Sequence, residues 1–149
     1  MRVVKAAAGQ GAAEQFVRRQ CPVELRAHRT RPVEQALVVM IDGDHRGVRG
    51  RLNELDAACR DAGVAERARH ERVGVIPTWN IETWLTYLDG DPVDEGRSNY
   101  PTLARERDCQ PHVEALREMC VVGNLREPAP LSLVAACDEY RTRLLMELR

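Results

Sequence analysis

A run of apolar residues that stops at an acidic turn constrains the fold of this chain more than any other feature. Residues 37–41 read Leu-Val-Val-Met-Ile, and Asp42-Gly43-Asp44 follows directly. An apolar run rich in β-branched types predicts a strand buried on both faces, as in a parallel sheet. We therefore expect residues 36–41 to form a central strand, parallel to its neighbours, in an α/β domain.

The acidic turn predicts a metal site. Side chains alternate along a strand, so Asp42 and Asp44 project to the same side if extended geometry continues through Gly43, which also lets a ligand or backbone come close. Two neighbouring carboxylates repel each other and raise each other's pKa unless a cation lies between them. A hard divalent ion suits such a site, and Mg²⁺ or Mn²⁺ is expected. A second interpretation stays open, in which these acids only end a strand and cap the next helix.

Composition places the chain among ordinary globular proteins. The 149 residues suffice for a single domain with its own core, and 44% are hydrophobic and 30% charged. The net charge of −1 gives no overall field that would attract nucleic acid, so such binding needs a local patch. The first residues lack the apolar core of a signal peptide, and no apolar run approaches the length of a membrane span. These features predict a cytoplasmic protein without a membrane partner.

The cysteines predict reduced thiols. They are odd in number and scattered, which does not fit a disulfide framework: Cys21, Cys59, Cys109, Cys120 and Cys137. Cys109 and His112 have a spacing found in zinc sites, with Cys120 within reach, but a second close pair of ligands is missing. Zinc therefore remains a minor alternative.

The first third of the chain predicts a strand, a helix and a basic loop. Residues 2–8 suggest a first strand, and a glycine-containing turn at 9–11 leads into a helix of about ten residues. Such a turn at a helix N-terminus can bind an anion, although a simple strand-to-helix turn explains it as well. Residues 22–35 contain two prolines and predict a loop. Arg29 and Arg31 in this loop are candidates for holding a phosphate chain, but Lys5 is the only lysine among 22 basic residues, so a general arginine bias also accounts for them.

The residues after the acidic turn predict a helix over 47–63. Its apolar side is formed by residues at helical spacing, and Gly63 is a natural C-terminal stop. These apolar residues are Val48, Leu52, Leu55 and Cys59. Arg46 and Arg49 lie near the first turn, where the helix dipole disfavours cations, so an anionic ligand such as nucleic acid would explain them, although chance placement on the surface explains them as well.

A second strand is predicted at residues 72–76, followed by a helix capped by Thr78 or Asn80. Glu82 falls in the first turn of that helix. Ligands bind at the carboxyl edge of an open parallel sheet, so Glu82 can face the same space as Asp42 and Asp44, although the helix dipole alone also favours an acid there. On the same helix Trp84 is expected to be buried, whereas Trp79 precedes it and should lie nearer the ligand edge.

The last third of the chain predicts a polar loop at 89–101 and two helices. The first covers residues 111–122, with an apolar side made by Val113, Leu116, Met119 and Cys120. The second begins at Ser132, with an apolar side made by Val134, Cys137, Leu144, Leu145 and Leu148. The order of elements predicts a three-layer α/β sandwich with a short, mostly parallel sheet, on which residues 102–149 pack as a helical extension.

Two motifs carry a resemblance to a known family. Asp42-Gly43-Asp44 after an apolar strand, and Ile81-Glu82-Thr83-Trp84 after a later strand, resemble TOPRIM domains within residues 1–90. The similarity is greatest to small stand-alone or defence-associated bacterial members. Such domains hold Mg²⁺ with acidic side chains to cut, join or make phosphodiester bonds. The resemblance implies that Asp42 and Asp44 are metal ligands and that Glu82 is a third acid, which serves both as a metal ligand and in catalysis.

One position departs from the TOPRIM pattern. The family has a glutamate before the first glycine turn, serving as general acid or base, whereas this chain has Ala8 before Gly9. Glu14, one turn into the following helix, is the candidate substitute. Positioned proton transfer supplies on the order of 10²–10⁴ in rate, so its loss would leave a domain that binds but does not cut. The alternative is therefore an inactive binding or scaffold subunit of a larger nucleic-acid-processing assembly, with a protein partner or a second copy of the chain.

Two other enzyme classes use an Asp-x-Asp after an apolar strand. Haloacid-dehalogenase-like phosphatases need a downstream lysine, but Lys5 lies upstream. Sugar-nucleotide glycosyltransferases normally need a much larger domain. The expected function is therefore that of a magnesium-dependent, TOPRIM-like nuclease from a bacterial defence or mobile-element system.

Overall fold

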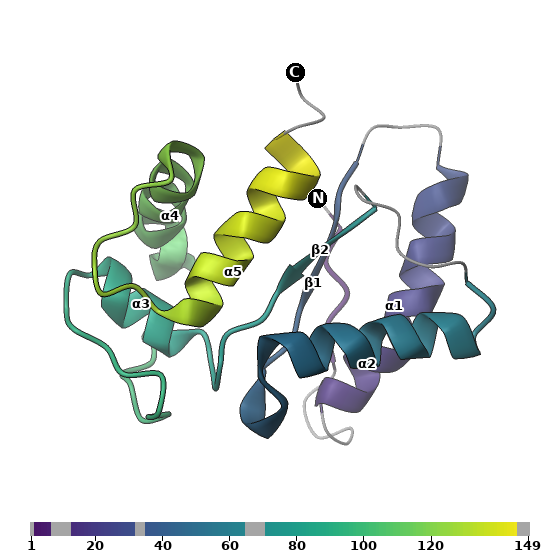
Figure 1. The fold of residues 1–149 in the computed structure, drawn as a ribbon, viewed down its shortest axis with the longest axis horizontal. Coiled ribbons are helices and arrows are strands. Elements are labelled where there is room, and N and C mark those ends of the chain that lie inside the picture. The colour runs from purple at the N-terminus through teal and green to yellow at the C-terminus, as the bar shows by residue number, and fades with distance from the viewer. Residues whose placement is uncertain (1, 7–12, 32–34, 65–70, 146–149) are drawn as a thin grey trace.

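The structure is a computed structural model that describes residues 2–6, 13–31, 35–64 and 71–145. Two strands and five α-helices succeed one another along these ranges (Figure 1): α1 Ala13–Thr30, β1 Leu37–Met40, α2 Gly47–Asp61, β2 Arg72–Val75, α3 Glu82–Leu88, α4 Gln110–Val122 and α5 Leu131–Tyr140. Single turns of other helical types occupy Asp44–Arg46, Glu106–Cys109 and Arg141–Leu145. The chain is therefore of the α/β class and mainly helical. None of the helices in these ranges is both long and apolar enough to cross a membrane.

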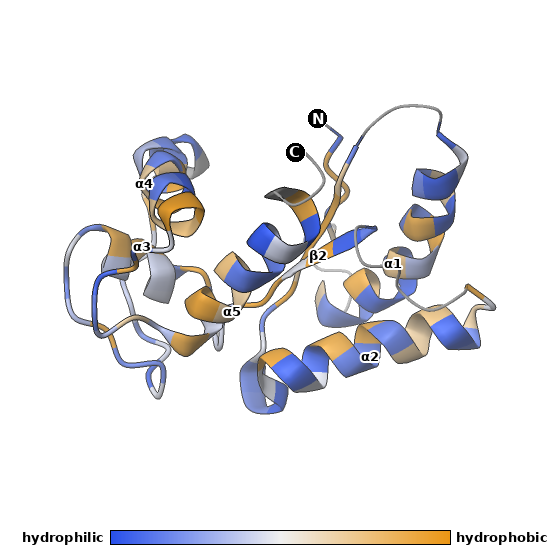
Figure 2. Cartoon of the chain, turned by 45° about the horizontal axis from the view of Figure 1, so that its top comes forward, coloured by the Kyte–Doolittle hydropathy of each residue, from blue (hydrophilic) through white to orange (hydrophobic). Residues whose placement is uncertain are grey.

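The two strands pair in parallel, as predicted. Leu37 lies opposite Arg72 and Met40 opposite Val75. Together they make up the whole sheet within the described residues. Helix α5 lies on one side of the strands and α1 and α2 lie on the other, and the strands themselves carry mostly hydrophobic residues (Figure 2). A complete three-layer sandwich, which would need a wider sheet, stays a prediction.

The prediction that β1 is central and buried on both faces is wrong. Val39 is 6% exposed and packs into a core with Leu25 of α1 and Leu55 of α2, whereas Val38 is 53% and Met40 52% exposed. The reason is that α5 packs against β2, so that the second face of β1 is left uncovered by the described part of the chain. Among the described residues β1 is thus an edge strand.

The first third of the chain differs from its prediction. Residues 2–6 form no strand, while residues 7 and 8 and the glycine turn at 9–11 lie outside the described residues. Helix α1 continues through Pro22 to Thr30, so the loop predicted at 22–35 is wrong up to that point. A proline inside a helix costs about 3 kcal/mol. The helix persists because Cys21 and Leu25 are buried in the core that α1 shares with α2.

The elements around the acidic turn agree with their predictions. Helix α2 ends at Asp61, and Gly63 adopts the left-handed conformation, with φ of 68°, that terminates it. Leu55 and Cys59 are fully buried on its inner side. Strand β2 begins at Arg72, as expected, so periodicity and glycine placement located both elements.

A second core lies between α3, α4 and α5. Trp84 is 1% exposed, as predicted, and its Nε1–H donates to Ser132 Oγ at 2.8 Å. Helices α4 and α5 each start one residue before the predicted position. Val113 is 58% exposed, so the prediction that it lies on the buried side of α4 is wrong. Leu148 and the side chain of Leu145 lie outside the described residues.

The cysteines are not all reduced. Cys120 of α4 and Cys137 of α5 form a disulfide, while Cys21, Cys59 and Cys109 are free. The prediction failed because the two cysteines meet only when α4 packs on α5. With Cys120 oxidised and His112 bonded to Asp89, the zinc alternative loses two of its three ligands.

Candidate functional site

The loops that follow the two strands lie against each other. The Gly43 N–H donates to the Pro77 carbonyl oxygen at 2.7 Å. A Cβ atom at position 43 would lie only 2.9 Å from the Thr78 carbonyl oxygen, so this position has room only for glycine. The predicted close approach at Gly43 is therefore made by backbone. It brings the acidic turn beside the segment that leads into α3 and Glu82.

Asp42 and Glu82 are acidic neighbours. The pKa of Asp42 is raised above its usual value, mainly because its carboxyl group loses hydration and further because the carboxylates of Asp44 and Glu82 repel its charge, while Arg51 opposes the shift. Neither the Asp42 nor the Glu82 carboxylate makes a hydrogen bond or ion pair with the described part of the chain.

The helix cap predicted for this region is absent, since α3 begins without a side-chain cap. Thr78 instead donates to Glu95, and Asn80 donates to the Ser98 carbonyl oxygen.

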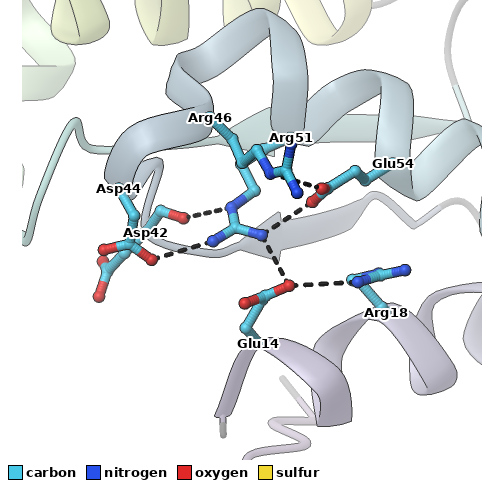
Figure 3. A network of polar contacts seen from close by, with 7 residues as sticks. All are labelled: Glu14, Arg18, Asp42, Asp44, Arg46, Arg51 and Glu54. Carbon is cyan, nitrogen blue, oxygen red and sulfur yellow. Dashed lines mark hydrogen bonds and ion pairs between the residues drawn. The ribbon is translucent and has the colours of Figure 1, made fainter.

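Asp44 reaches the site through a turn rather than through strand alternation. Strand β1 ends at Met40, and Asp44 has φ of 48°, a left-handed conformation that aspartate tolerates better than most residues. Its Oδ2 accepts a hydrogen bond from Arg51 at 2.9 Å. The two aspartates are therefore close, as Figure 3 shows, but for a different geometric reason than the one predicted.

Arg51 of α2 organises the acidic groups (Figure 3). Its side chain is 4% exposed. The Nε donates to the Asp42 backbone carbonyl oxygen at 2.9 Å, and Nη2 donates to Asp44. The Nη1 pairs with Glu14 at 2.7 Å and with Glu54 at 2.8 Å. The fixed fork of the guanidinium thus connects three carboxylates and one carbonyl.

Arg51 is absent from the residues predicted for the site, although the sequence contains a signal for it. Position 51 falls three residues after Val48 and four before Leu55, on the predicted buried side of the helix. A charge at a buried position requires partners. The helical spacing therefore indicated that position 51 needs partners for its charge, but not which side chains supply them.

An open hollow of about 310 Å³ lies beside this network. Acidic and basic side chains line it together: Glu14, Arg18, Asp44, His45, Arg46, Arg51 and Glu54. The His45 ring meets Trp79 edge to face, with 5.1 Å between centroids, so Trp79 lies beside the hollow as predicted. Arg46 pairs with Glu54 at 3.2 Å. The lining is therefore polar and nearly balanced in charge.

Glu14, the candidate substitute for the missing glutamate, does line the hollow. Its pKa is lowered, chiefly by the hydrogen bond from Arg51. It also pairs with Arg18 at 3.2 Å. Glu14 is consequently ionised at neutral pH, a state that suits a charged partner or a weak base rather than an acid. Ala8 lies outside the described residues.

The four arginines predicted to bind nucleic acid separate into two groups. Arg46 lines the hollow, and Arg49 is exposed in the first turn of α2. Arg29 and Arg31 lie near the opposite end of α1, about 22 Å of helix rise from Glu14. Arg29 there forms two hydrogen bonds with Glu71, at 2.6 and 2.7 Å. Of these four arginines, Arg46 therefore shares the hollow with Asp44, whereas Arg29 and Arg31 lie away from it.

The carboxylates of the site suit a hard cation by chemistry, since Mg²⁺ binds oxygen ligands. Within the described residues, Asp42 and Glu82 have carboxylate lone pairs without donors, whereas Asp44 shares its Oδ2 with Arg51. No group of three His, Cys, Asp or Glu side chains is already arranged as a metal site in the part of the chain that the structure describes. Binding would therefore require these side chains to close around the ion.

The chain was also compared with protein-family models, curated proteins and solved structures. None of the three comparisons found a match.

Proposed function

We propose that this protein carries out magnesium-dependent phosphodiester chemistry on nucleic acid, as a TOPRIM-like nuclease of a bacterial defence or mobile-element system. One observation carries the proposal. The carboxylates of Asp42 and Glu82 have no hydrogen-bond or ion-pair partner among the described residues, and both acids follow the carboxyl ends of parallel strands. The pKa of Asp42 is raised first by loss of hydration, then by the charge of Asp44 and then by that of Glu82, so the acids repel one another. A divalent cation would relieve that repulsion.

In this proposal Asp42 and Glu82 hold the ion, and Asp44 contributes the oxygen that Arg51 does not use. The ion supplies the polarisation of the phosphoryl group and the stabilisation of the leaving oxygen. Arg46, at the N-cap of α2, and Arg49, in its first turn, contact neighbouring phosphates. The three-layer sandwich of the TOPRIM fold belongs to the same proposal.

The second candidate is an inactive TOPRIM-like subunit that binds nucleic acid within a larger assembly. Arg51 favours it, because this permanent cation already pairs with Asp44, Glu14 and Glu54 without a metal. Such a subunit would need a protein partner or a second copy of the chain to complete its task. Its arginines would bind phosphate, and its acids would be structural.

Calorimetric titration with Mg²⁺ and Mn²⁺ tests the first step of the proposal. We expect one divalent ion to bind the wild type, and binding to be lost in Asp42→Asn and Glu82→Gln. Asp61→Asn, which changes an exposed acid at the end of α2, should bind like the wild type. Equal binding by all four proteins, or by none, contradicts the proposed site.

Cleavage assays on single- and double-stranded DNA and RNA separate the two functions. A nuclease should cut in the presence of Mg²⁺ or Mn²⁺, and Asp44→Asn should abolish cutting while the fold is kept. A protein that neither binds metal nor cuts is not a nuclease on its own. If nucleic-acid binding then survives Asp44→Asn but is lost when Arg46 and Arg49 are replaced, the binding subunit is the correct function.

A further inference from the structure

Two buried thiols meet between α1 and α2. The Sγ atoms of Cys21 and Cys59 lie 3.9 Å apart, although 38 residues separate them along the chain. Each residue is 3% exposed, and neither belongs to the disulfide between α4 and α5. The pair lies in the core under β1, outside the hollow described above.

A buried guanidinium lies against one of the two thiols. Arg72 is completely buried, and its Nη1 lies 3.2 Å from Cys21 Sγ. Its Nη2 donates to Asp56, while its Nε has no hydrogen-bond partner within the described residues. This contact sets Cys21 apart, because it places the permanent positive charge of a guanidinium beside its sulfur.

The second thiol has the opposite environment. The pKa of Cys59 is raised to about 11, first by burial and then by the neighbouring Cys21. Cys59 therefore keeps its proton, and the sulfur in contact with Arg72, that of Cys21, is the one that we assign as the attacking atom. Two thiols in contact, one of them beside a cation, form an arrangement in which oxidation leads to a disulfide.

We propose that Cys21 and Cys59 are a reversible modification site that a peroxide converts into a disulfide joining α1 to α2. The Cys21 thiolate attacks one peroxide oxygen, the O–O bond breaks, and Cys21 becomes a sulfenic acid while the other oxygen leaves as water after protonation. Cys59 sulfur then attacks Cys21 sulfur, the S–O bond breaks, and the Cys59 proton leaves with the second water. Two thiols and one hydrogen peroxide thus give one disulfide and two water molecules.

The two sulfurs are already in contact. Bond formation requires them to approach from 3.9 Å to the bond length of about 2.05 Å. Helix α1 carries Glu14, and α2 carries Arg51 and Glu54. The cross-link would therefore fix the two helices that form the ion-pair network beside the hollow, whether or not the proposed function is correct.

Peptide mapping after peroxide treatment tests the proposal in the full chain. Cys109→Ser removes the remaining free thiol and serves as the parent. After treatment and alkylation we expect a mass loss of two hydrogens and one peptide that links Cys21 to Cys59, both reversed by dithiothreitol. The melting temperature should rise by about 5–15 °C on oxidation, because the cross-link closes a long loop.

Two variants of this parent test the order of the steps. In Cys59→Ser the sulfenic acid has no resolving thiol, so dimedone should label Cys21. In Cys21→Ser, Cys59 should remain unlabelled under the same treatment. Circular dichroism and the melting temperature show that each variant is folded.

Three results would overturn the proposal. The first is that both thiols remain unchanged after prolonged peroxide treatment of the folded parent. The second is that alkylation reaches both thiols but no linked peptide forms. The third is that dimedone labels Cys59 in preference to Cys21, which would contradict the role assigned to Arg72.

Discussion

Replacing Arg51 by methionine should destabilise the fold, because it removes the cation at the centre of the ion-pair network. Methionine keeps much of the apolar stem but removes every donor that reaches Glu14, Asp44, Glu54 and the Asp42 carbonyl oxygen. Three carboxylates would then face one another without their shared cation. We expect a clear loss of stability from this single change.

The size of the loss follows from the exposure of the groups left behind. Removing one partner of a buried ion pair costs about 3–5 kcal/mol. The side chains of Glu14, Asp44 and Glu54 are 32%, 45% and 22% exposed, so water replaces part of what Arg51 provides. We therefore expect a loss of about 2–3 kcal/mol in the free energy of unfolding. For a chain of this length, that loss of stability corresponds to a melting temperature lower by about 4–12 °C.

Urea unfolding at several pH values provides the assay, with Arg49→Met as the matched control. Arg49 lies two positions earlier on α2 and is exposed, so its replacement should change stability by less than about 0.5 kcal/mol. Arg51→Lys keeps the charge but loses the fork, and should fall between the wild type and Arg51→Met.

The pH dependence of the difference has a definite sign. Because Arg51 lowers the pKa of Glu14 in the folded state, its stabilisation is present above the unfolded pKa of glutamate and is lost as pH falls through the lowered pKa. The difference in the free energy of unfolding between the wild type and Arg51→Met should therefore become smaller in acid. An Arg51→Met protein as stable as Arg49→Met, or a gap that widens in acid, would refute the reasoning.

Four further outcomes are expected. Asp42→Asn should stabilise the protein at neutral pH, and the gain in stability should fade as the pH falls. The raised pKa of Asp42 makes its ionised form costly to the folded state only above the pKa of unfolded aspartate, and urea unfolding at neutral and acid pH measures this. Mg²⁺ at a hundred times its dissociation constant should stabilise the wild type by about 2.7 kcal/mol but leave Asp42→Asn unchanged in thermal melts, and equal shifts would place the ion elsewhere. Trp84→Ala should cost about 3–5 kcal/mol in urea unfolding, and a variant that melts like the wild type would contradict the burial of Trp84. Gly43→Ala should cost about 1–3 kcal/mol in the same assay, because its Cβ would meet the Thr78 carbonyl oxygen; an unchanged stability would show that the two loops separate easily.

Local sequence patterns were sufficient to predict an element when its own residues determine its structure. The apolar spacing of α2 and the stop at Gly63 predicted that helix, and the short apolar run after Arg72 predicted β2. The burial of Trp84 followed from its place on a helical stripe. In each case the residues that decide the structure are neighbours along the chain, so the pattern is visible without knowledge of the fold.

Other features failed because distant segments decide them. Pro22 suggested a break, but α1 continues through it because Cys21 and Leu25 bury against α2. The apolar run of β1 suggested burial on both faces, yet α5 packs against β2 and leaves Val38 exposed. Cys120 and Cys137 gave no sign of pairing, since only the packing of α4 on α5 brings them together.

The candidate site divides in the same way. The sequence by itself determined which acids follow the strands, because Asp42, Asp44 and Glu82 occupy the positions where parallel strands end and helices begin. Only the tertiary structure decided that Arg51 links Asp44 to Glu14. An ion pair depends on a few ångströms between side chains of separate helices, and such distances are set by how α1 packs on α2 rather than by spacing along either helix.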